Sequence, residues 1–173
     1  ELLSLDLSNN ALTGTLPDAL FRLPNIQNMV LVKNCFRTKL PRSICESSSV
    51  RILALDGLAA GSDCRTSLWD PFSIFGDSYF IDHSQHTIPS CLFDMTNLTT
   101  LHLSGNGLTG NIESVRLKSS SKLTSLSLSH NRLSGTIPGS LKNGALRFQE
   151  FDVSHNRFSG GYSNNQMNTN DNN

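Results

Sequence analysis

The stretch LLSLDLSNNALTGTLPDAL, residues 2–20, decides how this chain folds, and its pattern returns as LTSLSLSHNRLSGTIPGSL at residues 123–141. In each copy leucines alternate with polar residues, an asparagine follows, and glycine and proline come after it. The alternation predicts a short strand whose leucines point inward and whose polar residues point outward. The proline predicts an extended or short 3₁₀ return segment in place of a long helix.

Further copies of this pattern occupy most of the chain. The second begins at Ile26, 24 residues after Leu2, and others begin at Val50, Leu98, Leu123 and Phe148. A degenerate fourth copy ends in residues 88–92. Pro41 and Pro89 lie 48 residues apart, which is twice 24, so we expect about two coils and no large inserted domain around the irregular middle, residues 61–88.

These copies predict one α/β solenoid, because a unit of this length can bury its apolar face only against its neighbours. We expect residues 1–160 to form a right-handed superhelix of about seven coils, with a parallel sheet on the concave side and short 3₁₀ or irregular segments on the convex side. Residues 161–173 contain six asparagines and no leucine, so we expect a disordered polar tail there.

An asparagine follows the strand in most copies, at a point where the chain turns. A buried side-chain amide there can satisfy backbone groups of adjacent coils. We expect this structural role for Asn10, Asn34, Asn106, Asn131 and Asn156.

Charge and cysteine content restrict the classes of partner and cofactor. Fourteen Lys and Arg balance fourteen Asp and Glu without a basic block, which argues against nucleic acid, and this segment offers no apolar run of about 20 residues for membrane contact. The four cysteines do not have zinc-site spacing. We expect buried free thiols, and the alternative is one disulfide between Cys64 and either Cys45 or Cys91.

The pattern LxxLxLxxNxLxGxIPxxL resembles the plant-type leucine-rich repeat of receptor kinase ectodomains, receptor-like proteins and polygalacturonase-inhibiting proteins. The resemblance covers residues 1–160 and is weak in the third and fourth copies. It implies a fragment of an extracellular or cell-surface protein, with a cytoplasmic location as the alternative. It also implies ligand binding on the strand face. The triplet Asn97-Leu98-Thr99 has the form of an N-glycosylation acceptor and fits the extracellular reading.

Outward positions of the strands become polar and ionisable toward the C-terminal copies. We expect the ligand-facing patch there, and the alternative is an ordinary solvated strand face. His130 and His155 occupy equivalent positions in adjacent copies and suggest a pH-sensitive pair, but no third ligand indicates a metal site. The candidate ligand-binding residues are His102, His130, Arg132, Glu150, Asp152, His155 and Arg157.

Aromatic residues gather in the irregular middle, where Trp69 and Tyr79 are candidate anchors for a partner, or else fill space left by missing leucines. No nucleophile elbow, metal motif or phosphate loop is present, so we expect neither catalysis nor a cofactor. The sequence therefore predicts non-enzymatic recognition of a protein or peptide. The alternatives are a structural spacer and the regulatory ectodomain of a receptor kinase whose catalytic domain lies elsewhere.

Overall fold

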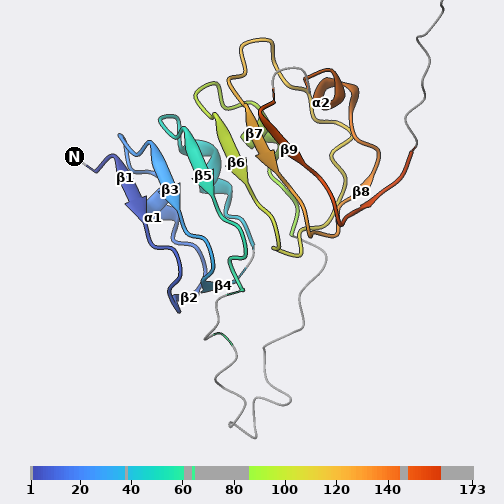
Figure 1. The fold of residues 1–173 in the computed structure, drawn as a ribbon. Helices are drawn as coiled ribbons and strands as arrows, with labels where there is room; N and C mark the ends of the chain where they lie inside the picture. The colour runs from blue at the N-terminus through green and yellow to red at the C-terminus, as the bar shows by residue number, and fades with distance from the viewer. Residues whose placement is uncertain (1, 38, 61–63, 65–85, 145–147, 161–173) are drawn as a thin grey trace, which may run out of the picture.

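A parallel sheet of six short strands runs along the molecule in the computed structural model (Figure 1). The structure describes residues 2–37, 39–60, 64, 86–144 and 148–160. Neighbouring strands pair in parallel in a single register, in which Leu5, Met29, Leu53, Leu101, Leu126 and Phe151 lie side by side. The strands are β1 (Ser4–Asp6), β3 (Asn28–Val30), β5 (Ile52–Ala54), β6 (Thr100–His102), β7 (Ser125–Ser127) and β9 (Glu150–Asp152).

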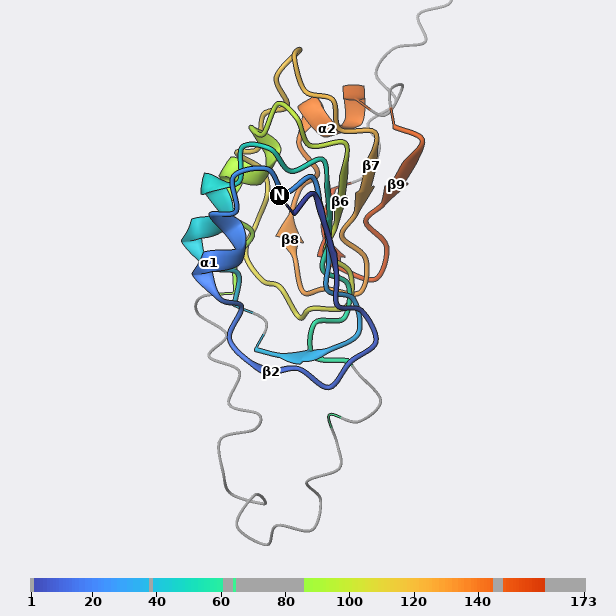
Figure 2. The same ribbon diagram turned by 90° about the vertical axis from the view of Figure 1, so that its left-hand side faces the viewer.

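The return segments on the opposite side of each coil are short (Figure 2). Each of the four helical turns whose bounds the structure describes directly follows a proline, whose fixed backbone angle suits a helix start. These turns are α1 (Asp18–Phe21), η1 (Arg42–Glu46), η3 (Ser90–Phe93) and α2 (Gly139–Gly144). Two small parallel ladders lie between strand face and return side: β2 (Thr13–Gly14) pairs with β4 (Cys35–Phe36), and β8 (Ser134–Gly135) pairs with β10 (Arg157–Phe158).

The inward-pointing residues form one continuous core that passes from coil to coil. Met29, Leu31, Leu55, Leu103 and Leu128 are completely buried. In the first coil, by contrast, Leu2 and Leu3 are half exposed, because among the described residues a coil packs on one side of them only. The architecture is the expected α/β solenoid, and its stability depends on stacking of neighbouring coils.

The irregular middle differs from the sequence-based expectation. Strand β5 pairs directly with β6, and Ile52 lies beside Thr100, so no strand of a separate fourth coil stands between them. Where the described residues resume, Thr87 forms a parallel bridge with Thr109. The expectation of two coils was wrong because the fourth copy has no alternating strand segment ahead of Pro89, and matched spacing alone does not make a coil. The six strands of the sheet therefore correspond to six coils, one strand in each.

The cysteines also differ from expectation, since all four form disulfides. Cys35 bonds Cys64 and Cys45 bonds Cys91, with Cα–Cα distances of 5.3 and 5.7 Å. Cys45 lies in η1 and Cys91 in η3, which pack together because their coils are direct neighbours. The anticipated free thiols were wrong, as was a pairing of Cys64 with Cys45 or Cys91.

Parts of the sequence-based reading fall outside the described residues. These parts are the aromatic anchors Trp69 and Tyr79, the path of most of residues 61–88, and the tail at residues 161–173. In the described part of the chain, no helix has both the length and the apolar character that a membrane crossing requires.

Candidate functional site

A line of hydrogen-bonding side chains crosses four strands on the concave face. His102, at the end of β6, places Nε2 2.6 Å from the hydroxyl of Ser125 on β7 and 3.3 Å from Oε2 of Glu150 on β9. Ser125 in turn donates to Glu150 at 2.7 Å. On the other side of the ring, Nδ1 of His102 lies 3.7 Å from Oδ2 of Asp56. We call these four residues the strand-face cluster.

Strand register explains why the strand-face cluster forms. Thr100, Ser125 and Glu150 lie side by side in the ladder, and so do His102, Ser127 and Asp152. Neighbouring strands are about 4.8 Å apart, so a long side chain reaches diagonally to the next strand. His102 uses this reach to contact Ser125 and Glu150.

Asp56 is the most buried carboxylate of the cluster, with 29% of its side chain exposed. It follows β5, and its Oδ1 accepts a 2.6 Å hydrogen bond from the backbone N–H of Ser104 in the next coil. Burial raises the pKa of Asp56, although the hydrogen bonds from Ser104 and the nearby His102 oppose this rise. The Ser104 hydrogen bond therefore holds the carboxylate in place, but its contacts with Ser104 and His102 do not fully offset the effect of burial. A carboxylate in this state is suited to accept a further hydrogen bond from a ligand.

Serine hydroxyls extend the polar line beside the cluster. The hydroxyl of Ser104 lies 2.6 Å from that of Ser127 and accepts a 3.1 Å hydrogen bond from Ser129. Ser127 and Ser129 are only 8% and 4% exposed. The three serine hydroxyls therefore form a row of hydrogen-bonding groups beside the strand-face cluster.

Asp152 is bound to its own turn. Its Oδ1 accepts a 2.9 Å hydrogen bond from the backbone N–H of Ser154, and this bond is the main reason why its pKa is lowered. Asp6 does the same for Ser8 at the other end of the sheet, where the hydroxyl of Ser8 contributes most to the lowered pKa. Both carboxylates accept hydrogen bonds within their own turns, and both still place negative charge on the strand face.

The two histidines of the predicted patch stack on each other. The rings of His130 and His155 lie 4.1 Å apart at an angle of 16°. Both residues have φ of 53°, the left-handed conformation that Asn9 and Lys33 also adopt at equivalent points. The stack therefore lies in the turns beyond β7 and β9. Among the described residues, no group of three His, Cys, Asp or Glu is arranged to hold a metal ion.

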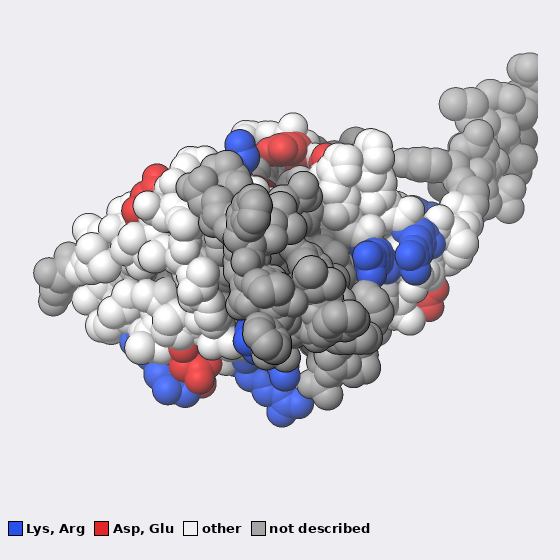
Figure 3. All heavy atoms as spheres, turned by 90° about the horizontal axis from the view of Figure 1, so that it is seen from below, with Lys and Arg blue, Asp and Glu red and all other residues white. Residues whose placement is uncertain are grey.

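The predicted arginines belong to a different part of the surface. The backbone of Arg157 lies in β10, and the N–H of Arg132 donates to Leu108 just before β8. Both residues therefore lie along the ladder that β8 and β10 form, which we call the lower ladder, and not in the six-stranded sheet. Seen from below, Lys and Arg side chains form small separate groups (Figure 3). The structure thus divides the expected patch into the strand-face cluster, the histidine stack and two arginines beside the lower ladder.

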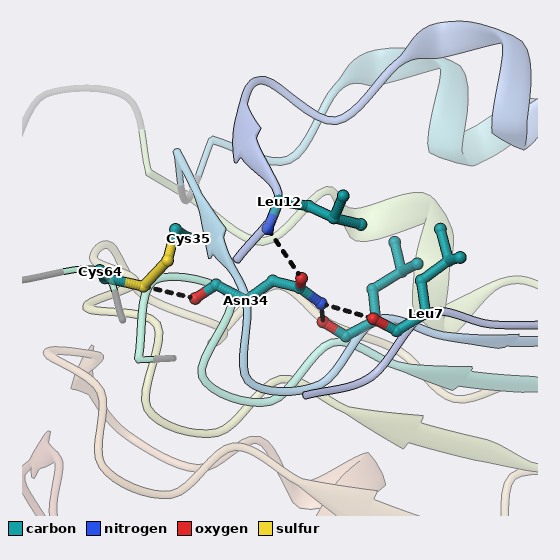
Figure 4. Close-up of a disulfide and its surroundings, with 6 residues drawn as sticks. Leu7, Leu12, Asn34, Cys35 and Cys64 are labelled. Atoms are coloured by element: carbon teal, nitrogen blue, oxygen red, sulfur yellow. Dashed lines mark hydrogen bonds between the residues drawn. A yellow bond between two sulfur atoms is a disulfide. The ribbon is translucent and has the colours of Figure 1, made fainter. Parts of the chain in front are cut away.

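The asparagines that follow the strands connect neighbouring coils. Asn34 donates to Leu7 and Leu31, and its oxygen accepts from the N–H of Leu12 (Figure 4). Asn106, Asn131 and Asn156 repeat this arrangement toward the C-terminus. Asn10 is exposed and donates only within its own turn, to Leu7 and Ser8.

Comparisons with known proteins agree with this geometry. A family profile described as Leucine Rich Repeat matches residues 1–23 and 122–143, and a second Leucine Rich repeat profile matches residues 94–112. The plant peptide hormone receptor RGFR1, solved in complex with RGF2, is 26% identical with a TM-score of 0.66, over 92% of this chain. The chain therefore contains leucine-rich repeats, and it is similar to a plant receptor of that fold.

Two further solved structures share the fold of this leucine-rich-repeat chain. Pollen Receptor Kinase 3 is 24% identical with a TM-score of 0.66 and is matched over 96% of this chain and 67% of its own. The ectodomain of the receptor kinase GASSHO1/SCHENGEN3 from Arabidopsis thaliana, in complex with CASPARIAN STRIP INTEGRITY FACTOR 2, is 22% identical with a TM-score of 0.59 over 90% of this chain. The search of curated proteins finds no match.

The leucine-rich-repeat chain is short beside two of these relatives, since it spans 22% of the RGFR1 chain and 19% of the GASSHO1/SCHENGEN3 ectodomain. Sequence reasoning placed His102 and Glu150 in the ligand-facing patch but left out Asp56 and Ser125. Both stand at outward positions of the repeat, so the pattern marks them as surface residues. Their contact with His102 depends on which strands are neighbours.

Proposed function

We propose that this leucine-rich-repeat chain is a non-enzymatic recognition module that binds a peptide or protein segment across its concave strand face. The strand-face cluster carries this proposal, because it aligns donors and acceptors from four successive coils on one open surface. An extended ligand that lies across the strands meets one polar position at each coil, as a peptide backbone requires.

Charge on the face indicates what kind of peptide fits. The six strands contain no Lys or Arg, whereas Asp6, Glu150 and Asp152 lie in them and Asp56 follows β5. The whole chain has a formal net charge of zero, so the acidic character is local to this face. Complementary charge favours a ligand with Lys or Arg side chains and speeds their encounter.

An extracellular or cell-surface setting is part of the same proposal. Structural disulfides persist in oxidising compartments, and this chain has two. Two of the similar receptors are solved in complex with a partner, RGFR1 with RGF2 and GASSHO1/SCHENGEN3 with CASPARIAN STRIP INTEGRITY FACTOR 2. We infer that this chain contributes a part of a binding surface in a receptor-like or secreted protein.

A displayed library of random peptides tests the proposal. Peptides selected on the wild-type chain are measured by interferometry against the double variant H102A/E150A. The control is R22A/E46A, which removes a comparable 2.8 Å ion pair from the convex side, where both side chains are more than half exposed. We expect the concave variant to weaken binding at least about tenfold, which corresponds to about 1.4 kcal/mol, and the control to bind as wild type.

Other outcomes would contradict the proposal. Selected peptides that bind both variants equally would place recognition elsewhere, and a library that yields no binder would favour a spacer role. A pool without enrichment in Lys and Arg would argue against the electrostatic part alone. Charge reversal at Arg132 and Arg157 is a separate arm, which tests whether the lower ladder takes part.

A further inference from the structure

Asn97 stands at an exposed turn between η3 and β6, in the only Asn-x-Ser/Thr triplet of the 173 residues. Leu98 after it is completely buried, and the hydroxyl of Thr99 donates to the carbonyl of Arg51 at 3.0 Å. This alternation fixes the direction of the Asn97 side chain, which points away from the core. The acceptor amide is therefore presented to solvent by a well-packed backbone.

We propose that Asn97 carries an N-linked glycan. The co-reactant is a lipid pyrophosphate-linked oligosaccharide of the secretory route. In the transfer, the bond between the sugar's anomeric carbon and the pyrophosphate oxygen breaks, and a new bond forms from that carbon to Nδ2 of Asn97. One proton leaves Nδ2, the lipid pyrophosphate departs with the electron pair, and nothing is oxidised or reduced.

The folded structure accommodates the product. Nδ2 of Asn97 donates to the carbonyl of Ser48 at 3.1 Å, and its oxygen lies 3.5 Å from Nζ of Lys122. A glycosylated amide keeps one hydrogen and its oxygen, so both contacts can persist. Asn97 is exposed, and the attached sugar extends into solvent without displacing a core residue.

The glycan would lie at a defined edge of the solenoid. Asn97 lines a shallow recess of about 270 Å³, together with Leu3, Asn25, Gln27, Ser49 and Arg51. All of these residues precede strands, whereas His102 ends its strand and Asp56 follows one. A sugar at Asn97 therefore covers the edge at which the strands begin and leaves the strand-face cluster accessible.

The inference rests on the extracellular part of the proposed function, and the experiment separates the two. The 173-residue chain is secreted from insect cells behind a leader peptide, and wild type is compared with N97Q, T99A, T99S and N25Q. Gel mobility is measured with and without peptide N-glycosidase, and mass spectrometry reads the conversion of Asn97 to Asp that this enzyme causes.

We expect wild type, T99S and N25Q to shift on deglycosylation, and N97Q and T99A to show no shift. T99S is informative because serine keeps both the acceptor triplet and a hydroxyl for Arg51. N25Q is the matched control, since Asn25 lies in the same recess without a triplet.

A secreted wild-type chain with both disulfides formed and an unmodified mass would overturn the inference. Retained chain whose leader peptide has been removed and whose mass is unmodified would overturn it as well, because that chain entered the secretory route, where the co-reactant is present, and was not modified. Peptide binding is measured on the same preparations. Binding without a glycan would contradict the inference and leave the proposed function standing. A glycan without binding would support the inference and contradict the proposed function.

Discussion

Replacement of Asn131 by alanine should destabilise the fold far more than the same replacement at Asn10. Asn131 is 7% exposed, and its Oδ1 accepts from the backbone N–H groups of Asn106 and Leu108 at 3.1 and 3.0 Å. Its Nδ2 donates to the carbonyls of Leu103 and Leu128, both at 2.9 Å. Alanine removes all of these bonds while the coils stay packed.

The expected cost follows from the buried groups left without a partner. Each buried N–H that loses its acceptor costs about 1–3 kcal/mol, and in N131A two N–H groups, those of Asn106 and Leu108, lose theirs. We therefore expect N131A to lower the free energy of unfolding by about 2–6 kcal/mol. Asn10 is exposed and donates only to Leu7 and Ser8, and water can replace it, so N10A should cost under about 1 kcal/mol.

Urea unfolding followed by far-ultraviolet circular dichroism measures both variants against wild type. Unchanged slopes with a lower midpoint for N131A would show that stability and not the extent of unfolding has changed. Equal losses for the two variants would refute the reasoning, because the two residues share residue type and repeat position, whereas only Asn131 is buried and joins two coils.

Three further outcomes follow from the structure. Alkylation before reduction should modify no cysteine, and loss of the bond between Cys35 and Cys64 in a double serine variant should cost about 3 kcal/mol in thermal or urea unfolding. Burial raises the pKa of Asp56, so the folded state binds its proton more tightly than the unfolded chain. The contribution of Asp56 to native stability therefore falls as the pH rises from about 4 through the folded pKa. Asn keeps the acceptor for Ser104, so the stability of D56N relative to wild type should grow between about pH 4 and 7, and a constant difference in urea midpoints would contradict this. Gly135 has φ of 80° and an added Cβ would lie 2.7 Å from Oε1 of Glu113, so G135A should lower the melting temperature, whereas G139A in α2 should leave it unchanged or raise it.

The strands could be predicted from the sequence because each has a large apolar residue at its centre, which is stable only when it points into the core. Period-two alternation decides which side chains are buried, and copies 24 or 25 residues apart decide which strands pair. Leu53, Leu101 and Leu126 all follow from that pattern. The short helical turns were also within reach, since proline marks where each begins.

The middle of the chain could not be predicted, because spacing reports distance along the chain and not contact in space. Pro41 and Pro89 keep a multiple of the repeat length, yet β5 and β6 are neighbours. The same assumption of an extra coil prevented a correct prediction of the cysteine pairing. A coil placed between η1 and η3 would separate Cys45 from Cys91, and its absence brings them together.

The site was predicted in part for a related reason. His102 and Glu150 were recognised as outward residues near each other, and they do lie 3.3 Å apart. Asp56 was left out because the outward residues just before it, Ile52 and Ala54, are apolar, and the patch was expected in the C-terminal copies. Arg132 and Arg157 were included because they follow the strands closely in sequence, but the turn at each asparagine carries them to the lower ladder.

The disulfide between Cys45 and Cys91 has a consequence for how the molecule survives cleavage. A protease cut anywhere in residues 65–90 separates the polypeptide into two fragments, one with three strands of the sheet and one with the other three. The sulfur bridge would still join those fragments covalently. Such a nicked molecule would migrate as one band without reductant and as two with it, while the six-stranded sheet stayed whole.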